Sequence, residues 1–437
     1  MDKVFQEILQ IATAKLKDAL SQDQGFDPDD FEQQVRQFTR QLGQQMLKVW
    51  AEEKVEQAHT EAAFCGCGIR RRVHKRKRMW WLSSFGQIQI TEVCLACPKA
   101  HGKDRPFQRL SGLRCRGKTK ALKRVLADFG AEKSFGAASE QLWEHYGIRL
   151  DPSSIRGVVR QQAERAEEFV AHQHQGAISA YQTHQGCWPG NERLVVQSDG
   201  SMVRTGRLKP ASEGGYSPKR RLPKRHRQTQ WREVRLSCVE EVSEGQRLYG
   251  AVMGLASQVG QQMFGLAVLM GWGEQTLVHG VGDGAPWIAQ QMAEVFPKQR
   301  YLLDRYHLME HLYAGAEALP LELGLSATEW VERQLRAIDG AQVDKVVSGC
   351  RAMAGQKADH PMEGLARYLD NQRDHLDYPW AKEQGLPIGS GAVEGGHRHV
   401  IQQRLKLPGA WWSEESVNPM LALRTLRANG WWTAFWN

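Results

Sequence analysis

The chain alternates between long segments with helical periodicity and short apolar runs that predict strands. From Asp27 to about Ala63, apolar residues recur at steps of three and four, Asp27 can cap the helix, and Pro28 suits its first turn. We interpret this helix as packing on its own domain. A dimerising helix pair is the alternative, although the apolar stripe is short for a coiled coil.

The segment that follows predicts a β-ribbon and then a helical region. Residues 79–82 and 87–93 read as two strands joined by a Ser-Ser-Phe-Gly turn. Three helices are expected after residue 118, with Gly147 ending the second, Asp151 capping the third and Pro152 in its first turn. This order resembles a helix-turn-helix, and a generic three-helix packing unit is the alternative.

The second half predicts strands alternating with helices. An apolar run at residues 194–196 leads to Asp199 and Gly200, which we interpret as a buried strand that turns at the glycine into a neighbouring strand. Further strands are expected at residues 231–239, 248–252, 276–283 and 301–303, the last two each followed by a helix. Residues 321–378 read as purely helical, so we expect an all-α insertion of about 60 residues.

Composition narrows the class of protein. The 437 residues predict several domains, and 41% hydrophobic with 24% charged residues is ordinary for a soluble globular protein. No run approaches 18 apolar residues and the N-terminus lacks a signal-peptide core, so we expect a cytoplasmic protein without a membrane span. The net charge of +9 favours a polyanionic partner, most commonly nucleic acid.

Two cysteine pairs lie at the two ends of the predicted ribbon. They are Cys65 with Cys67, and Cys94 with Cys97. Four thiolates close together suit a tetrahedral structural Zn²⁺, and His101 could replace one thiol. The Cys-x-Cys spacing is tighter than the usual spacing, so buried structural cysteines are the alternative.

Basic residues gather in several places that could contact DNA phosphates. Residues 70–78 contain seven Lys or Arg, and residues 204–235 contain eleven against two acids. The third helix of the helical region and the helix that carries Glu394 add further Lys and Arg residues. The candidate DNA contacts are Arg70, Arg71, Arg72, Lys75, Arg76, Lys77, Arg78, Arg156, Arg160, Lys219, Arg220, Arg221, Lys224, Arg225, Arg398, Arg404 and Lys406.

Three acids are candidate metal ligands. Asp199 follows a buried apolar run and needs a cation or donors, because an unpartnered buried carboxylate is costly. Asp283 ends a strand beside a helix N-terminus, where α/β sheets place their sites, although it could be only a cap. Glu394 lies among glycines on a helix that also carries Arg398, with which it could form a surface pair.

These acids stand in a recognisable order. Residues 281–285 (Val-Gly-Asp-Gly-Ala), 303–308 (Leu-Asp-Arg-Tyr-His-Leu) and 389–394 (Gly-Ser-Gly-Ala-Val-Glu) resemble the signature regions of DDE transposases of bacterial insertion sequences. The ISKra-type group is the nearest resemblance, and it covers roughly residues 64–437. Asp304 and His307 match the Asp-x-x-His pattern that such enzymes place after the second acid, and could orient the site, or be a cap and a packed histidine.

The resemblance implies a mixed α/β multidomain protein with an RNase H-like mixed sheet flanked by helices. It also implies two Mg²⁺ ions, with Mn²⁺ as a substitute: Asp199 would bridge both, Asp283 would bind one and Glu394 the other. The implied partners are the double-stranded inverted repeats of transposon ends and target DNA, with the protein as a homodimer or larger. The alternatives are an inactive DNA-binding accessory factor and a structure-specific nuclease with the same core.

The expected domain organisation follows the chain. It comprises an N-terminal helical region (1–63), a zinc-ribbon-like β-ribbon (64–105), a helix-turn-helix domain (106–185), the first part of the catalytic core (190–312), the all-α insertion (313–385) and the C-terminal helices of the core (386–437).

Overall fold

The computed structural model describes residues 27–184, 190–208, 227–243, 245–320 and 323–437, together with residues 6, 9–14, 17–18 and 21. The chain divides into two compact units, Met1–Val159 and Arg160–Asn437, and the boundary falls within a long helix. Among the described residues, no helix combines the length and the apolar character needed to cross a membrane.

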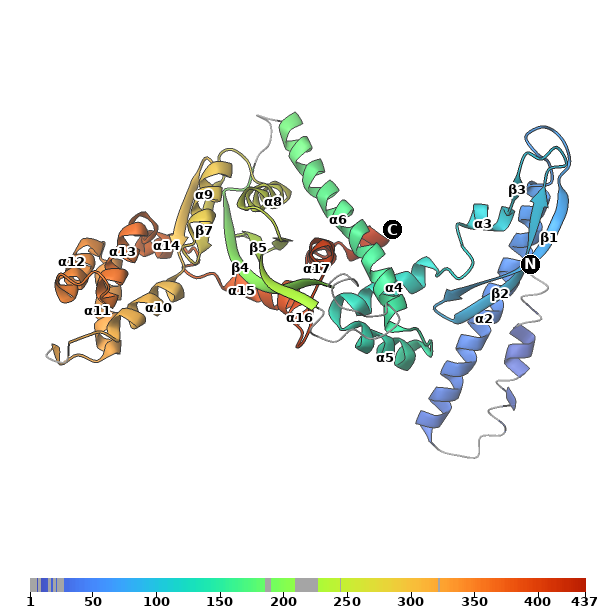
Figure 1. Ribbon diagram of the computed structural model, residues 1–437, viewed down its shortest axis with the longest axis horizontal. Helices are drawn as coiled ribbons and strands as arrows, with labels where there is room; N and C mark the ends of the chain where they lie inside the picture. Colours follow the sequence, from blue (N-terminus) through green and yellow to red (C-terminus); the bar gives the residue numbers. More distant parts are fainter. Residues whose placement is uncertain are drawn as a thin grey trace. The chain divides into compact units, whose positions relative to one another are not determined.

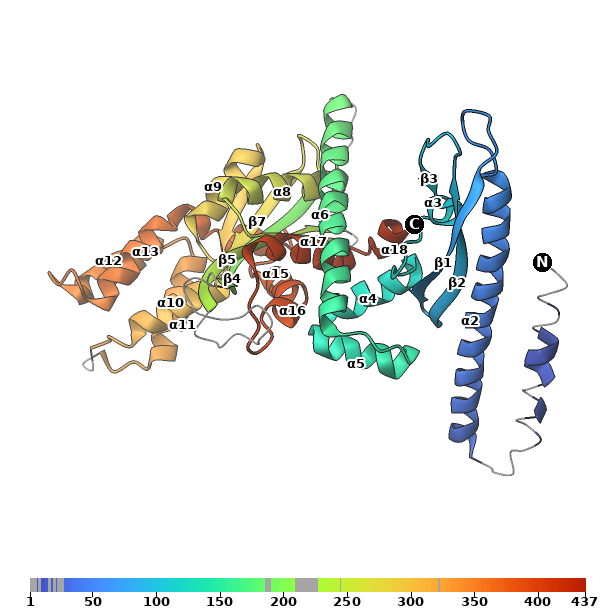
Figure 2. The same ribbon diagram turned by 45° about the vertical axis from the view of Figure 1, so that its right-hand side comes forward.

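In the first unit, a long helix packs on a three-stranded ribbon. Helix α2 (Pro28–Glu61) lies against β1 (Arg72–Ser83) and β2 (Gly86–Ala96), and β3 (Lys103–Asp104) and α3 (Pro106–Ser111) complete this part (Figure 2). The Asp27 carboxylate caps α2 by accepting from the Asp29 N–H at 2.9 Å. Buried Val55 and Ala58 of the helix share a core with Met79 and Trp81 of the ribbon. The predicted helix and strands are confirmed, and the C-terminal half of α2 packs on its own domain.

Three helices follow, and the third continues from the first unit into the second. They are α4 (Lys120–Glu132), α5 (Phe135–Tyr146) and α6 (Pro152–Thr183). Local signals set their ends, because Thr119 and Ser134 cap α4 and α5, and Gly147 ends α5 with a left-handed φ of 61°. Helix α6 starts at Pro152 as expected. It extends far beyond a short recognition helix, and the helix-turn-helix stays a prediction.

The second unit is built on a five-stranded mixed sheet with the order β6-β5-β4-β7-β8 (Figure 1). The strands are β4 (Arg193–Leu208), β5 (Arg227–Glu241), β6 (Arg247–Val252), β7 (Leu277–Gly282) and β8 (Gln299–Leu303). Strands β6, β5 and β4 pair antiparallel, whereas β4, β7 and β8 pair parallel. The expected mixed sheet of a mixed α/β protein is therefore confirmed.

The turn expected at Gly200 is wrong. Strand β4 runs without interruption from Arg193 to Leu208, and its register with β5 is continuous from Leu194 opposite Glu241 to Leu208 opposite Arg227. Gly200 lies inside this strand opposite Arg235, where a Cβ would come 2.4 Å from Glu233 Oε1. The glycine therefore permits a close cross-strand contact, and Asp199 lies in mid-strand.

Helices cover the sheet. Helices α8 (Ala256–Leu269) and α9 (Pro286–Val295) pack through Val259, Met263 and Ile288 on Leu194 and Val196 of β4. Helix α15 (Gly391–Gly396) contacts β4 and β5, and continues through a π-helical segment, η4 (His397–Gln402), into α16 (Gln403–Leu405). The chain ends with η5 (Glu414–Ser416), α17 (Val417–Ala428), which lies along β6, and α18 (Trp432–Trp436).

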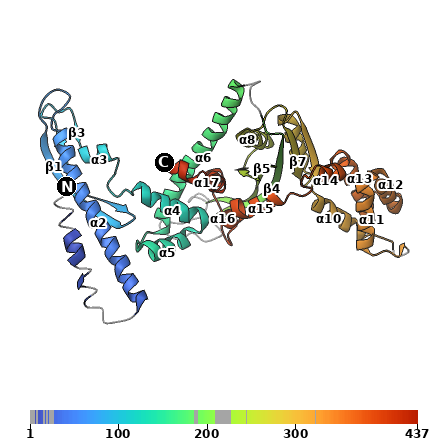
Figure 3. The same ribbon diagram turned by 180° about the vertical axis from the view of Figure 1, so that it is seen from behind.

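The expected helical insertion is confirmed as helical. After α10 (Arg305–Ala316) come α11 (Ala327–Asp339), α12 (Val343–Ala354), α13 (Pro361–Asn371), the short turn η3 (Arg373–His375) and α14 (Tyr378–Glu383) (Figure 3). Their buried side chains, including Trp330, Val347 and Leu365, form one core with Leu303 of β8 and Leu308 of α10. The insertion thus packs on one edge of the sheet before the chain returns to α15.

Candidate active site

Asp199 lies on β4, the central strand of the sheet. Because successive side chains of a strand point to opposite faces, Asp199 shares a face with Val195 and Gln197. Its side chain is 32% exposed, and its Oδ2 lies 3.0 Å from Nε2 of the buried His397. The first candidate ligand is therefore reachable from solvent and is contacted by a residue of the helix that carries Glu394.

Asp283 follows the neighbouring parallel strand. The register pairs Gln197 of β4 with Val281 of β7, so Asp199 and Asp283 each stand two residues further along adjacent strands. The Asp283 Oδ1 accepts from the Ala285 N–H at 2.8 Å at the start of α9. This contact closes the turn before α9, whose N-cap residue is Ala285, so Asp283 does not cap the helix, and it lies at the same level of the sheet as Asp199.

Glu394 is brought to β4 by the docking of α15. The buried Gln197 accepts from the Val393 N–H at 3.0 Å through Oε1 and donates to the Gly389 carbonyl at 3.4 Å through Nε2. Glu394 itself is exposed, and its Oε1 accepts from the Ser390 hydroxyl at 3.4 Å. The third acid therefore projects from a helix that is fixed beside Asp199.

The loop before α15 is held by the parallel strands. Besides the contact to Gln197, three hydrogen bonds fix consecutive positions of this loop: His279 Nε2 to the Pro387 carbonyl at 2.8 Å, the Arg305 N–H to the Ile388 carbonyl at 3.0 Å, and the Ser390 N–H to Asp304 Oδ2 at 2.5 Å. Burial lowers the pKa of His279, so its neutral ring donates Nε2–H to the carbonyl.

Asp304 and His307 have separate roles in the structure. Asp304 is 1% exposed and caps α10, because its Oδ1 accepts from the His307 N–H at 2.9 Å while its Oδ2 accepts from Ser390. The His307 side chain is 44% exposed and lies 3.6 Å from Glu310. Asp304 therefore positions the loop that precedes Glu394, and no contact of the His307 ring joins it to the three acids.

Two of the residues that build this site did not stand out in the sequence. Gln197 and His397 are both buried polar side chains, and each joins β4 to the chain around Glu394. The available signals were weak: Gln197 precedes Asp199 by two positions, and His397 follows Glu394 by three, which places each pair on one face of its element.

The three acids have few charged partners. Among the ion pairs of the described residues, none joins Asp199, Asp283 or Glu394 to a lysine or arginine. In the described part of the chain, the three carboxylates also do not form a cluster with all oxygens within 4.8 Å of one another. The three carboxylates therefore do not converge on one point in this structure.

The predicted DNA contacts have diverse surroundings. Arg70 and residues 72–78 of β1 are exposed, whereas the half-buried Arg71 is bound to Asp104 at 3.2 Å and to the Ala62 carbonyl at 3.1 Å. Arg156, Arg398 and Lys406 are exposed, and Arg160 pairs with Glu164 at 2.9 Å. Lys219, Arg220, Arg221, Lys224 and Arg225 lie outside the described residues.

The phosphate contact expected of Arg404 is wrong. Arg404 is only 3% exposed, and its guanidinium carbon lies 4.7 Å from the centre of the Trp412 ring. The Trp412 indole in turn donates to the Leu405 carbonyl at 3.2 Å. Both side chains therefore pack the helix onto the following segment, and neither is available to DNA.

The cysteine prediction needs one change. Cys65, Cys67 and Cys97 gather as expected, but His101 joins them in place of Cys94. Cys94 is buried on β2 opposite Lys75, apart from this group. A hydrogen bond from the Cys67 N–H and another with His101 lower the pKa of the Cys65 thiol to about 6, which favours the thiolate.

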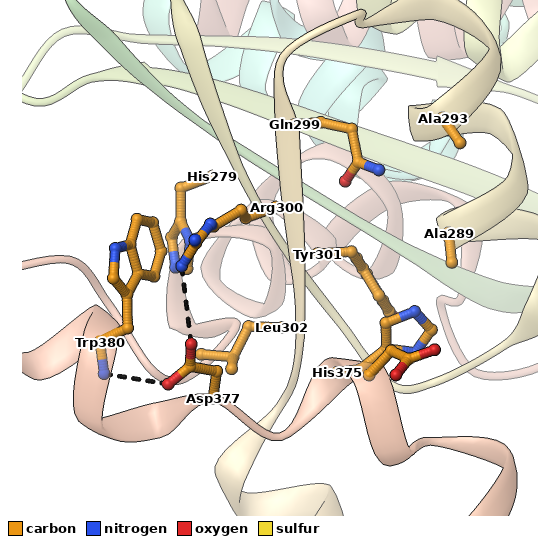
Figure 4. Close-up of a pocket in the computed structure, with 11 residues that line it drawn as sticks. His279, Ala289, Ala293, Gln299, Arg300, Tyr301, Leu302, His375, Asp377 and Trp380 are labelled. Atoms are coloured by element: carbon orange, nitrogen blue, oxygen red, sulfur yellow. Dashed lines mark hydrogen bonds and ion pairs between the residues drawn. The ribbon is translucent and has the colours of Figure 1, made fainter.

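A cavity of about 460 Å³ beside β8 lies apart from the acids (Figure 4). Its wall includes His279, Arg300, Asp377 and Trp380, and the Arg300 guanidinium stacks at 4.3 Å on Trp380 and lies 3.5 Å from Asp377. Arg300, Asp377 and Trp380 are thus engaged with one another, and none of the three acids lines the cavity.

Comparison with known proteins adds two similarities. Residues 274–434 match UPF0236, an uncharacterised protein family, and this segment contains Asp283 and Glu394. No curated protein matches the chain. A solved structure, the Mos1 strand transfer complex, aligns over 62% of this chain and 85% of that chain with 12% sequence identity and a TM-score of 0.15. A TM-score this low does not define a shared fold.

Proposed function

We propose that this chain is a DDE-type transposase that binds the inverted repeats at the ends of an insertion sequence and cleaves and joins DNA strands there. The observation that carries the proposal is the docking of α15 on β4. Gln197 binds the Val393 N–H across 196 positions of sequence, and His397 contacts Asp199 at 3.0 Å. Both contacts bring Glu394 to the strand of Asp199 despite the helical insertion between them.

The metal would be held by Asp199, Asp283 and Glu394. Carboxylate oxygens are the ligands that Mg²⁺ prefers, and these three have no basic counter-ion among the described ion pairs except His397. When bound, a pair of Mg²⁺ ions would activate the attacking hydroxyl and stabilise the leaving oxygen of an in-line phosphoryl displacement.

The remaining residues of the site position these ligands. The His397 ring lies 3.0 Å from the Asp199 carboxylate, and Gln197 holds α15 against the strand through the Val393 N–H. Asp304 fixes Ser390, four residues before Glu394. Arg398 is exposed one turn after Glu394, where a cation can attract the phosphate backbone.

The test is a cleavage and joining assay on labelled DNA from the flanks of the gene, with Mg²⁺. Glu394→Gln removes the charge and keeps the shape, so cleavage and joining should be lost while DNA binding persists. Glu383→Gln, at an exposed position of α14, is the matched control and should retain both activities. Joining by Glu394→Gln at the wild-type rate would overturn the assignment. A wild-type chain that binds but never cuts would indicate an accessory factor, and one that cuts without joining would indicate a nuclease.

A further inference from the structure

Four potential ligands converge at the end of the ribbon where α2 stops. Cys67 Sγ lies 3.7 Å from Cys97 Sγ, and His101 Nδ1 lies 3.8 Å from both Cys65 Sγ and Cys97 Sγ. In a tetrahedral site with Zn–S bonds of about 2.3 Å and Zn–N bonds of about 2.1 Å, neighbouring ligand atoms are about 3.6 to 3.8 Å apart. These three distances are therefore close to the edges of a zinc tetrahedron.

Two tight turns present these ligands to each other. In the first, the Cys65 N–H bonds to the Ile69 carbonyl at 2.9 Å, and Gly68 takes a left-handed φ of 80°. In the second, the Ala100 N–H bonds to the Cys97 carbonyl at 3.0 Å, and Ala100 itself has a φ of 58°. A left-handed alanine costs free energy, and an interaction outside the backbone would offset this cost at the second turn.

Apolar packing does not supply that interaction. The buried core of this part of the chain lies between α2 and the ribbon, around Val55, Trp81 and Ile90. At the turns, by contrast, Cys67 and His101 are exposed and the Phe64 side chain is 63% exposed. Small units that lack a core need a cross-link, and a metal bound by three thiolates and one imidazole is such a cross-link.

We propose that Cys65, Cys67, Cys97 and His101, the last through Nδ1, bind one structural Zn²⁺ that joins the turn after α2 to the turn between β2 and β3. All four coordination positions are taken by protein, so the site is structural and has no open position for substrate. In the described part of the chain, no other group of three or more such ligands is as close.

The proposed cross-link lies at the start of β1, the strand that carries the exposed basic residues. The first turn leads directly into β1, which carries the exposed residues Lys75, Arg76 and Lys77, and the second follows its partner β2. Zinc would thereby fix where the basic strand starts relative to α2. The metal site does not depend on the proposed transposase activity.

The test begins with the full-length protein, purified with a thiol reductant and desalted. Zinc measured by inductively coupled plasma mass spectrometry should equal one ion per chain. Replacement by Co²⁺ should give the thiolate charge-transfer and intense d–d bands of a tetrahedral site. Substoichiometric zinc in the reduced wild-type chain, or octahedral Co²⁺ spectra, would overturn the proposal, and this measurement does not require any variant to fold.

Variants identify the ligands. Cys97→Ser and His101→Ala should lose the zinc, whereas His101→Cys should keep it with a changed Co²⁺ spectrum. Cys94→Ala and Cys115→Ser are the matched controls outside the cluster and should keep one zinc per chain. Asp199→Asn should also keep it, which separates this site from the three acids. Loss of zinc in Cys94→Ala with retention in His101→Ala would overturn the ligand set.

Discussion

Gly396 controls how closely the helix that carries Glu394 approaches the sheet. A Cβ at this position would lie 2.7 Å from Tyr249 Cε1 and 2.9 Å from Leu236 Cδ2, and both neighbours are buried. Since carbon atoms in contact are about 3.5 to 4.0 Å apart, Gly396→Ala must move α15 away from the sheet by about 1 Å. Gly395 has no atom within 4 Å of its Cβ position, so Gly395→Ala is a matched control in the same turn.

Two measurements follow from this geometry. Gly396→Ala should lower the free energy of unfolding by about 1–3 kcal/mol, the usual cost of overpacking, as measured by denaturant titration. Its strand-joining rate should fall by about 100-fold, because a displacement of about 1 Å at a catalytic group costs about that factor. Gly395→Ala should lose neither stability nor DNA affinity. If the two variants were equally stable and equally active, the close approach of α15 to Leu236 and Tyr249 would not be real.

Three further predictions concern Asp304, His174 and the basic strand. Asp304→Asn should lower the free energy of unfolding, measured by denaturant titration, by about 1.5–3 kcal/mol, because the buried carboxylate accepts from two backbone N–H groups. The control His307→Ala should change the free energy of unfolding by less than about 0.5 kcal/mol. Burial lowers the pKa of His174 from 6.5 to about 4, so the unfolded chain binds the proton first as the pH falls through this interval. Wild type should lose up to about 3 kcal/mol there relative to His174→Leu, and equal pH profiles of the two would contradict the burial of this ring. Arg76→Ala should reduce the slope of log affinity for DNA against log salt, measured by fluorescence anisotropy, by about 0.9. Arg71→Met removes a side chain that is already paired with Asp104 and should leave this slope unchanged. If Arg76→Ala and Arg71→Met gave equal slopes, the DNA would bind elsewhere.

Elements with local signals could be predicted from the sequence. Asp27, Thr119, Ser134 and Gly147 each act within a few residues of their own position, so their effects on helix ends do not depend on the rest of the fold. The same holds for Gly282 to Ala285, where a strand ends and a helix begins as expected.

Features set by distant partners could not be predicted in this way. Gly200 suggested a turn, yet its pairing with Arg235 on β5 lets β4 continue through it. Arg404 suggested a phosphate contact, yet Trp412 covers it after the chain has turned back. His101 displaced Cys94 because the turn after β2 points residues 97 and 101 to the same place, while Cys94 lies within the strand. In each case the deciding neighbour is set by tertiary structure.

The position of Glu394 is also set by distant partners and not by local signals. The helical insertion separates β8 from α15 in sequence, but its core residues pack among themselves and against Leu303 and Leu308. The loop that leads into α15 is instead bound, residue by residue from Pro387 to Ser390, to groups on or directly after β7, β8 and β4. The sheet therefore places the third acid, and the insertion only has to return the chain to this loop. Changes of length within the insertion, at the connection between α11 and α12 for example, should leave the relation between Asp199 and Glu394 intact, whereas a single substitution at Gln197 should disturb it.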